Sequence, residues 1–244
     1  PDEKEYVCAA GISPSGVVHF GNFRDVMTIY AVGQALKRKG KQVRLLFSWD
    51  DYDRFRKVPA GVDKRFEEHI GKPLTAVPDP KGDSKLSYAD RFERLFEAAI
   101  KELGIELDYR YQTKLYQSGA YDAAIKTALD NREVIAKVLL SLMSDKAKAA
   151  KEIDEAEYIE NYYPVSVYSE FSGKDFTTVT GYDGKTLTYL DKESKQEGEV
   201  VLGKDRNLKL AWKTDWPMRW KHEGVTFEPA GIDHASPGSG FDAG

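Results

Sequence analysis

The sequence predicts an α/β protein built on a parallel sheet, with a small β-rich insertion. Two observations support this fold class. An apolar run at residues 6–10 is followed by a helical pattern and then by a second apolar run at residues 43–49. A strand, a helix and a strand with short links form a βαβ unit, whose strands pair in parallel with a right-handed crossover. Over residues 162–210, β-branched and aromatic residues with turn signals replace this alternation, as in an antiparallel sheet.

The first elements follow from the spacing of apolar residues. Residues 6–10 form the first predicted strand, and Gly40 is a natural C-cap for the helix that follows. The second strand covers residues 43–49 and ends at the carboxylate cluster of residues 50–53. Between the strands, apolar residues recur near helical spacing at Phe23, Val26, Met27, Tyr30, Ala31 and Leu36.

A second helix is predicted to begin where Ser87 and Asp90 make a capping box, and Gly104 ends it. One face of this helix is traced by Phe92, Leu95, Phe96, Ala99, Ile100 and Leu103. The segments expected around it are a loop at 54–85 with a short helix near 64–70, a third strand at 105–111 and helical residues at 119–157.

The last third of the chain contains the insertion and a return to the sheet. Turn signals stand at Ser172-Gly173, Asp183-Gly184 and Glu197-Gly198, and residues 225–230 are expected to rejoin the parallel sheet. This pattern predicts three parts: residues 1–157 as the first part of the catalytic domain, 158–210 as the insertion, and 211–244 as the start of a second half.

Composition limits the function classes. A net charge of −4 gives no overall basic field for nucleic acid, and no apolar run is long enough for a membrane span. The lone Cys8 excludes an internal disulfide and a multi-cysteine metal site, which favours a cytoplasmic setting. The start at Pro1 and the Gly/Ser-rich last residues lead us to expect a trimmed fragment.

The turn after the first strand indicates nucleotide chemistry. It reads Gly11-Ile12-Ser13-Pro14-Ser15-Gly16 and leads into His19-Phe20-Gly21-Asn22 at the start of a helix. Small residues let the backbone approach a ligand, and N–H groups at a helix start attract anions. The turn and the 50–53 cluster both follow strands, so we expect them to meet at one edge of the sheet.

Four segments together resemble class I lysyl-tRNA synthetase, the archaeal-type enzyme. His19-Phe20-Gly21-Asn22 is similar to the first signature of class I aminoacyl-tRNA synthetases, and the others narrow the choice. They are Trp49-Asp50-Asp51-Tyr52-Asp53-Arg54-Phe55-Arg56-Lys57-Val58-Pro59, Asp215-Trp216-Pro217-Met218-Arg219-Trp220 and Gly231-Ile232-Asp233-His234. The resemblance implies a Rossmann-like parallel sheet and runs in order over nearly the whole chain.

The chain also departs from the family pattern. The second signature loop and the anticodon-binding part are missing, so we expect reduced or no activity of this chain alone. Many members carry metal-binding Cys or His pairs in the insertion. The similar places here read Ser169-Glu170-Phe171-Ser172 and Asp191-Lys192-Glu193-Ser194. Hydroxyls are poor zinc ligands, so we predict no bound zinc and no other protein metal site.

The resemblance implies that ATP activates L-lysine to lysyl-adenylate, with Mg²⁺ accompanying the ATP, and that the lysyl group then passes to tRNA(Lys). By the match of motifs, His19 and Asn22 would be catalytic through phosphate contacts. The ATP-binding residues implied are His19, Gly21, Asn22, Gly231 and Asp233. Without that context, a single His before a helix is more often structural.

The implied lysine-binding residues are Gly11, Ser13, Asp50, Asp51, Trp220 and His234. A carboxylate would receive a substrate ammonium, with Asp51 favoured over Asp50, because a buried cation needs a paired charge. Solvated turn carboxylates, or an Asp-x-Asp pair holding Mg²⁺, remain alternatives. Trp216 and Met218 are most simply core residues. Two other functions stay open: another small-acid adenylating ligase, and a non-catalytic protein that binds tRNA or a partner.

Overall fold

The computed structural model describes residues 3–150, 152–236 and 238–243. The chain forms two compact units, and each is described by itself. The first unit contains residues 1–115, 173–175 and 220–229, and the second contains the remaining segments, residues 116–172, 176–219 and 230–244. In the part of the chain that is described, we find no helix with the length and apolar character needed to cross a membrane.

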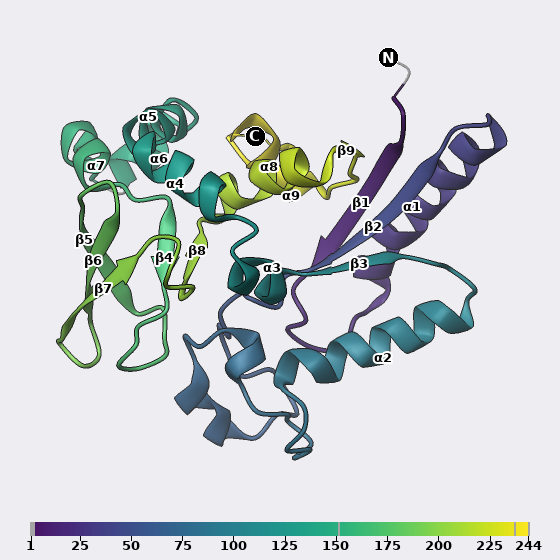
Figure 1. Cartoon of the computed structure of the whole chain (residues 1–244), viewed down its shortest axis with the longest axis horizontal. Coiled ribbons are helices and arrows are strands. Elements are labelled where there is room, and N and C mark those ends of the chain that lie inside the picture. Colours follow the sequence, from purple (N-terminus) through teal and green to yellow (C-terminus); the bar gives the residue numbers. More distant parts are fainter. Residues whose placement is uncertain (1–2, 151, 237, 244) are drawn as a thin grey trace. The chain divides into compact units, whose positions relative to one another are not determined.

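The first unit is built on a four-stranded parallel sheet with the order β3-β2-β1-β9 (Figure 1). The predicted return of the chain to the sheet is confirmed, because β9 pairs in parallel with β1. The strands are β1 (Tyr6–Ile12), β2 (Val43–Trp49), β3 (Asp108–Tyr111) and β9 (Val225–Phe227), and the helices between the first three are α1 (Phe20–Arg38) and α2 (Tyr88–Glu102). The predicted βαβ unit is therefore present.

Both crossover helices of the first unit pack on one face of its sheet. The strand residues that alternate toward this face form a buried core with α1 and α2: Cys8, Ala10, Val26, Ile29, Leu45, Phe47, Trp49, Phe96, Ile100 and Ile105. The sequence analysis assigned too many residues of α2 to its buried face. Leu95 and Leu103 are 54% and 60% exposed, because only the narrower stripe through Phe92, Phe96 and Ile100 meets the core.

The link from β2 to α2 contains two short 3₁₀ helices, η1 (Lys64–His69) and η2 (Leu74–Ala76). The predicted capping box of α2 is present, since Asp90 N–H donates to Ser87 Oγ at 3.1 Å and Ser87 N–H donates to the Asp90 carboxylate at 2.8 Å. Arg91 in the first turn of α2 forms an ion pair with the buried Asp79, which fixes the loop against the helix.

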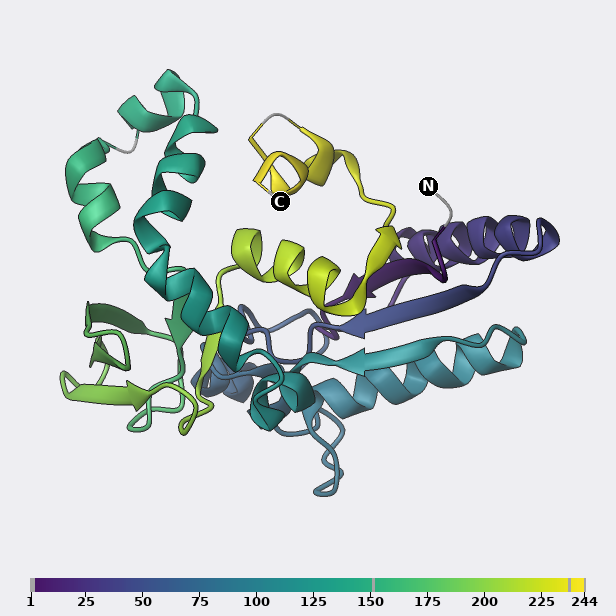
Figure 2. The ribbon, with the colours of Figure 1, turned by 45° about the horizontal axis from the view of Figure 1, so that its top comes forward.

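The second unit combines short helices with two small antiparallel sheets, one of β4 and β8 and one of β5, β6 and β7. Its strands are β4 (Val165–Val167), β5 (Thr177–Tyr182), β6 (Thr186–Asp191), β7 (Glu197–Val201) and β8 (Leu208–Leu210). Its helices are α4 (Asp122–Asp130), α5 (Arg132–Ser141), α6 (Asp145–Ala150), α7 (Glu155–Asn161), α9 (Ile232–Ala235) and α10 (Gly240–Ala243). Figure 2 shows α4 and α5 in teal, following one another along the chain. Two helices, α3 (Gln112–Ser118) and α8 (Trp212–Glu223), contain residues of both units.

One expectation about this region is corrected. Glu197-Gly198 is no turn, because both residues begin β7, and the reversal lies at residues 192–196. The two units begin and end at other residues than the three predicted parts. Residues of α3 and α4 contact the insertion: the Tyr182 hydroxyl donates to Asp130 at 2.9 Å, and Gln117 donates to the Arg206 carbonyl at 3.1 Å.

Candidate active site

The turn after β1 places an imidazole at the N-terminus of α1. His19 is the N-cap of this 19-residue helix, and its Nδ1 accepts a hydrogen bond from the Gly21 N–H at 3.1 Å. An accepting Nδ1 carries no proton, so the neutral ring has its proton on Nε2. His19 is exposed, and the first turn of α1 contains no acidic residue. An anion there would meet both the Nε2–H group and the positive end of the helix dipole.

Two glycines in this region occupy places that a side chain would disturb. A Cβ atom added at Gly21 would lie 3.0 Å from Cε1 of His19 and would push the imidazole away from its cap position. A Cβ atom at Gly11 would lie 2.8 Å from the Ser48 carbonyl oxygen of β2. Glycine at these positions therefore keeps the cap and the close strand pairing intact.

The turn and the acidic end of β2 meet, as the sequence predicted. The Ser13 hydroxyl donates to Asp53 Oδ2 at 2.6 Å, and the Asp50 N–H donates to the Ile12 carbonyl at 2.9 Å. Both contacts lie at the carboxyl ends of β1 and β2, the edge where parallel sheets bind ligands. A single region of the first unit thus contains the anion-facing helix start and the carboxylates.

The carboxylates of this cluster have different surroundings. Asp51 is 3% exposed, and its Oδ1 accepts the Thr113 N–H at 2.8 Å at the start of α3. Burial raises the pKa of Asp51 to about 6, against the lowering effect of Thr113, and the neighbouring Asp50 raises it further. Asp50 is 6% exposed. Asp50 and Asp51 are adjacent in the sequence and nearly buried, so this edge of the sheet favours the binding of a cation.

Another buried carboxyl group, Glu93 of α2, belongs to the same unit and was not singled out from the sequence. Glu93 is 5% exposed, and its Oε1 has no hydrogen-bond partner in the part of the chain that is described. Burial, followed by the charges of Asp51 and Asp90, raises the pKa of Glu93 to about 8. Its position next to Phe92 on the buried stripe of α2 is the sequence signal that could have revealed it.

The remaining predicted residues lie farther along the chain. Trp220, in the first unit, donates from Nε1 to a carboxylate oxygen of Glu228. Gly231 is the N-cap of α9 in the second unit, and Asp233 and His234 lie within that helix. The rings of Trp216 and Trp212 lie 5.0 Å and 6.0 Å from the His234 ring. The first unit therefore contains His19, Gly21, Asn22, Gly11, Ser13, Asp50, Asp51 and Trp220, whereas Gly231, Asp233 and His234 belong to the second.

Trp216 and Asp215, from the same predicted motif, are parts of the interior of the second unit. Trp216 is 5% exposed, as expected for a core residue, whereas Met218 is half-buried. Asp215 is fully buried and accepts hydrogen bonds from the Tyr116 hydroxyl and from the Arg219 guanidinium. The motif thus contributes a buried ion pair that the sequence analysis did not predict.

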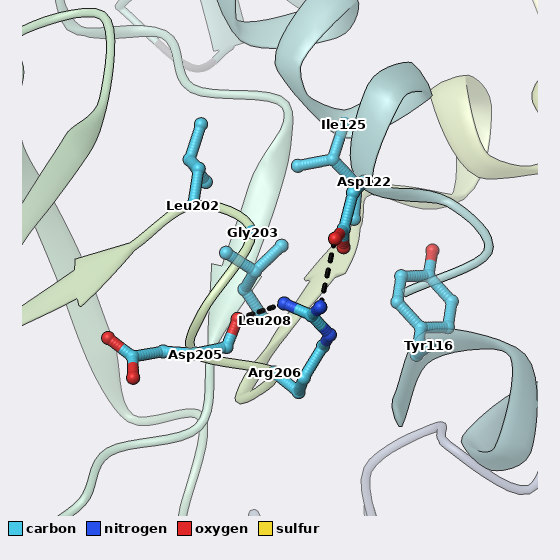
Figure 3. A pocket seen from close by; sticks show the side chains of 8 residues that line it. All are labelled: Tyr116, Asp122, Ile125, Leu202, Gly203, Asp205, Arg206 and Leu208. Atoms are coloured by element: carbon cyan, nitrogen blue, oxygen red, sulfur yellow. Dashed lines mark hydrogen bonds and ion pairs between the residues drawn. The ribbon is translucent and has the colours of Figure 1, made fainter. Parts of the chain in front are cut away.

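A small cavity in the second unit is too small for a substrate. Its volume is about 10 Å³, enough for about one water molecule, whereas ligand pockets are typically hundreds of Å³. Figure 3 shows the Arg206 guanidinium pointing at Asp122, with which it forms an ion pair at 3.0 Å. The lining residues are Tyr116, Asp122, Ile125, Leu202, Gly203, Asp205, Arg206 and Leu208. The cavity lies where α4 packs against the loop before β8, and the ion pair between Asp122 and Arg206 joins the two segments.

The four positions expected to match a zinc knuckle form a hydrogen-bonded cluster around Asp191. Asp191 is fully buried, and its Oδ1 accepts N–H groups of Glu193 at 2.8 Å and Ser194 at 3.2 Å. Burial favours a raised pKa of Asp191, but hydrogen bonds from the Ser169 and Ser172 hydroxyls and these N–H groups outweigh it and lower the pKa. Among the described residues, no group of three or more His, Cys, Asp or Glu side chains could hold a metal ion. This donor set does not fit zinc.

We therefore expect the stability of the insertion to depend on Asp191 rather than on a metal. Asp191→Ala should lower the free energy of unfolding by about 2 kcal/mol, because buried N–H and hydroxyl donors lose their acceptor. Incubation of the unmodified protein with 1,10-phenanthroline should leave its melting temperature unchanged. Asp183→Ala, which removes an exposed carboxylate that also accepts two N–H groups, is the control and should have a smaller effect. Zinc co-purifying at one ion per chain would contradict this prediction.

Comparison with known proteins places this geometry in context. The sequence model of the family described as "tRNA synthetases class I (K)" matches residues 1–244. The chain is similar to the lysine–tRNA ligase of Streptomyces coelicolor, with 43% identity over 100% of this chain and 46% of that protein. It is 44% identical to the lysine–tRNA ligase of Thermococcus kodakarensis over 100% of this chain and 44% of the relative. The chain thus spans a little under half the length of these relatives.

Proposed function

This chain belongs to the class I lysyl-tRNA synthetase family, and we propose that it takes part in the ATP-dependent activation of L-lysine. The observation that carries the proposal is the His19 cap, whose Nδ1 accepts the Gly21 N–H and leaves Nε2–H for a phosphate. The Ser13–Asp53 hydrogen bond at 2.6 Å supports it, because it joins the turn before this helix to the acidic end of β2. The triphosphate would meet the His19 imidazole and the helix start, and the ammonium of the amino acid would meet the carboxylates at the end of β2.

The chemistry proposed is attack of the lysine carboxylate on the α-phosphate of ATP, with pyrophosphate as the leaving group. This step needs little proton transfer, so catalysis consists mainly of positioning and charge stabilisation. His19 and Asn22 would hold the phosphates at the start of α1, and Gly21 would leave room for the nucleotide. Gly231 and Asp233 are the proposed contacts of the rest of ATP. Mg²⁺ bound to ATP would neutralise phosphate charge.

For lysine, we propose that Gly11, Ser13, Asp50, Asp51 and Trp220 of the first unit contact the substrate. His234 of the second unit is a further proposed lysine-binding residue. Asp50 and Asp51 would pair with a substrate ammonium, since both are nearly buried and a buried cation needs an opposite charge. The alternative of a Mg²⁺ site on Asp51 and Asp53 is less favoured, because these carboxylates already accept the Thr113 N–H and the Ser13 hydroxyl. The aromatic face of Trp220 suits the methylene stem of lysine.

The second half of the proposed reaction transfers the lysyl group to the terminal adenosine of tRNA(Lys). We place this reaction in the cytoplasm, where tRNA charging supports protein synthesis. No zinc is part of the proposal, because the insertion has Asp191 and serines at the knuckle positions.

The proposal is tested by lysine-dependent exchange of pyrophosphate into ATP, measured with the complete gene product. His19→Ala should lower kcat by about 100-fold or more, which is typical for loss of a group that stabilises transition-state charge. The control is His222→Ala, which changes an exposed histidine in the last turn of α8. It should leave the rate unchanged.

The other outcomes distinguish the alternatives. Exchange supported by another carboxylic acid and not by lysine would favour a different adenylating ligase. No exchange with any amino acid, together with binding of tRNA, would favour a non-catalytic role. Equal rates for His19→Ala and the unmodified protein would refute the role of the imidazole.

A further inference from the structure

The turn that leads to His19 is fixed from outside at two points. At one point, the Ser13 hydroxyl donates to Asp53 Oδ2 at 2.6 Å. At the other, the Ser15 carbonyl oxygen accepts the Tyr88 hydroxyl at 3.0 Å. The turn is also closed internally, because the Ser15 N–H donates to the Ser13 carbonyl at 2.8 Å. The side chains of Asp53 and Tyr88, from distant parts of the sequence, thus hydrogen-bond to Ser13 and Ser15 of the turn.

Tyr88 is itself rigidly placed. It is the first residue of α2, directly after the N-cap Ser87, and it is fully buried. Its ring packs against Phe55 and Phe92 at centroid distances of 5.1 Å and 4.9 Å. Its N–H donates to the Val77 carbonyl at 2.8 Å. Burial raises the pKa of Tyr88 to about 12, so its hydroxyl remains a donor at neutral pH.

The residues between the turn and α1 are only partly packed. Val17 is 74% exposed, and Phe20, the first residue of α1, is 90% exposed, although both are apolar. Val18 packs against the core of the first unit. Hydrophobic burial of this segment therefore depends on Val18, and the hydrogen bonds at Ser13 and Ser15 fix the turn that precedes it.

We propose that Tyr88 is a positioning residue for the nucleotide site. Its hydroxyl, together with Asp53 at the other end, holds the turn so that His19 and the start of α1 face the phosphates of ATP. Tyr88 touches neither substrate, and it acts through the Ser15 carbonyl. This inference rests on the proposed function, and it adds a residue that lies outside the signature motifs.

The test compares Tyr88→Phe with Tyr30→Phe in the complete gene product. Tyr88→Phe keeps the ring among Phe55 and Phe92 and removes only the hydroxyl. Loss of one hydrogen bond that orients the reacting groups should lower kcat of pyrophosphate exchange by about 3- to 10-fold. The KM for lysine should stay the same. The control removes a hydroxyl on α1 for which no hydrogen bond is found in the described part of the chain, so its kcat should not change.

Amide hydrogen exchange of residues 15–18 gives a second readout that does not need activity. Exchange there should become faster in Tyr88→Phe and stay unchanged in Tyr30→Phe. An unchanged kcat or unchanged amide exchange in Tyr88→Phe would overturn the inference. A melting temperature far below that of Tyr30→Phe, with KM for lysine raised as much as kcat is lowered, would show a purely structural role and also overturn it. If the unmodified protein lacks lysine-dependent exchange, the proposed function fails, and amide exchange alone decides whether Tyr88 holds the turn.

Discussion

Asp215→Ala should destabilise the second unit by about 3–5 kcal/mol, the cost typical of breaking a buried ion pair from one side. Asp215 is fully buried and accepts hydrogen bonds from Arg219 and from the Tyr116 hydroxyl, and Lys209 Nζ lies 3.7 Å from its carboxylate. Removing the carboxylate takes away a negative charge that two buried cations, Arg219 and Lys209, contact. The midpoint of urea unfolding, followed by tryptophan fluorescence, measures the loss.

The fluorescence reports on this site directly, because Trp212 and Trp216 stack at 5.1 Å on the same helix, α8. Asp215→Asn keeps one acceptor and should cost less than Asp215→Ala. Asp205→Ala removes a carboxylate that accepts the Val201 N–H at 2.8 Å and should have a smaller effect still. Equal midpoints for Asp215→Ala and the unmodified protein would refute the importance of this network.

Glu93→Gln should stabilise the protein at alkaline pH and remove part of its pH dependence. The pKa of Glu93 is raised from 4.5 to about 8, with burial as the largest cause. The folded state therefore binds this proton more tightly than the unfolded state, and stability decreases as pH rises from about 4.5 to about 8. At pH 8 to 9 the neutral glutamine avoids a buried negative charge, so a gain of about 2–4 kcal/mol is expected.

The measurement is the free energy of unfolding from pH 4 to pH 9 for both proteins. A weaker dependence between pH 4 and 6 should remain in Glu93→Gln, because the pKa of Asp51 is raised to about 6 in the same sense. Glu102→Gln changes an exposed carboxylate on the same helix and should follow the unmodified protein. Parallel curves for Glu93→Gln and the unmodified protein would contradict a raised pKa of Glu93.

Local patterns made much of the fold predictable. The βαβ unit and the capping box at Ser87 depend on residues close together in sequence. The return of the chain at β9 was predicted from a local apolar run, although its partner strand β1 lies near the other end of the chain. The meeting of the His19 turn with the acidic end of β2 was predictable too, since the carboxyl ends of parallel strands share one edge. Geometry of this kind follows from topology alone.

The contacts that the sequence did not reveal join distant residues. Tyr88 and Ser15 are 73 positions apart, and Tyr116 and Asp215 are 99 positions apart. Pairing at such separations depends on the whole fold and leaves no periodic pattern. The units differ from the predicted parts for the same reason, because the helices from α4 onward contact the insertion through pairs such as Asp130 and Tyr182.

The insertion has Asp191 and serines where related proteins carry metal-binding residues, and this changes how it would respond to oxidants. Clusters of metal-bound thiolates are attacked by peroxide, which oxidises the sulfur and releases the ion. Here the corresponding positions are occupied by Ser169, Ser172, Asp191 and Ser194, and the chain's one cysteine, Cys8, has none of its surface exposed. The chain thus offers peroxide no cysteine sulfur at its surface. Because we expect no zinc in the insertion, we also expect its folding not to depend on how much zinc the cell can supply.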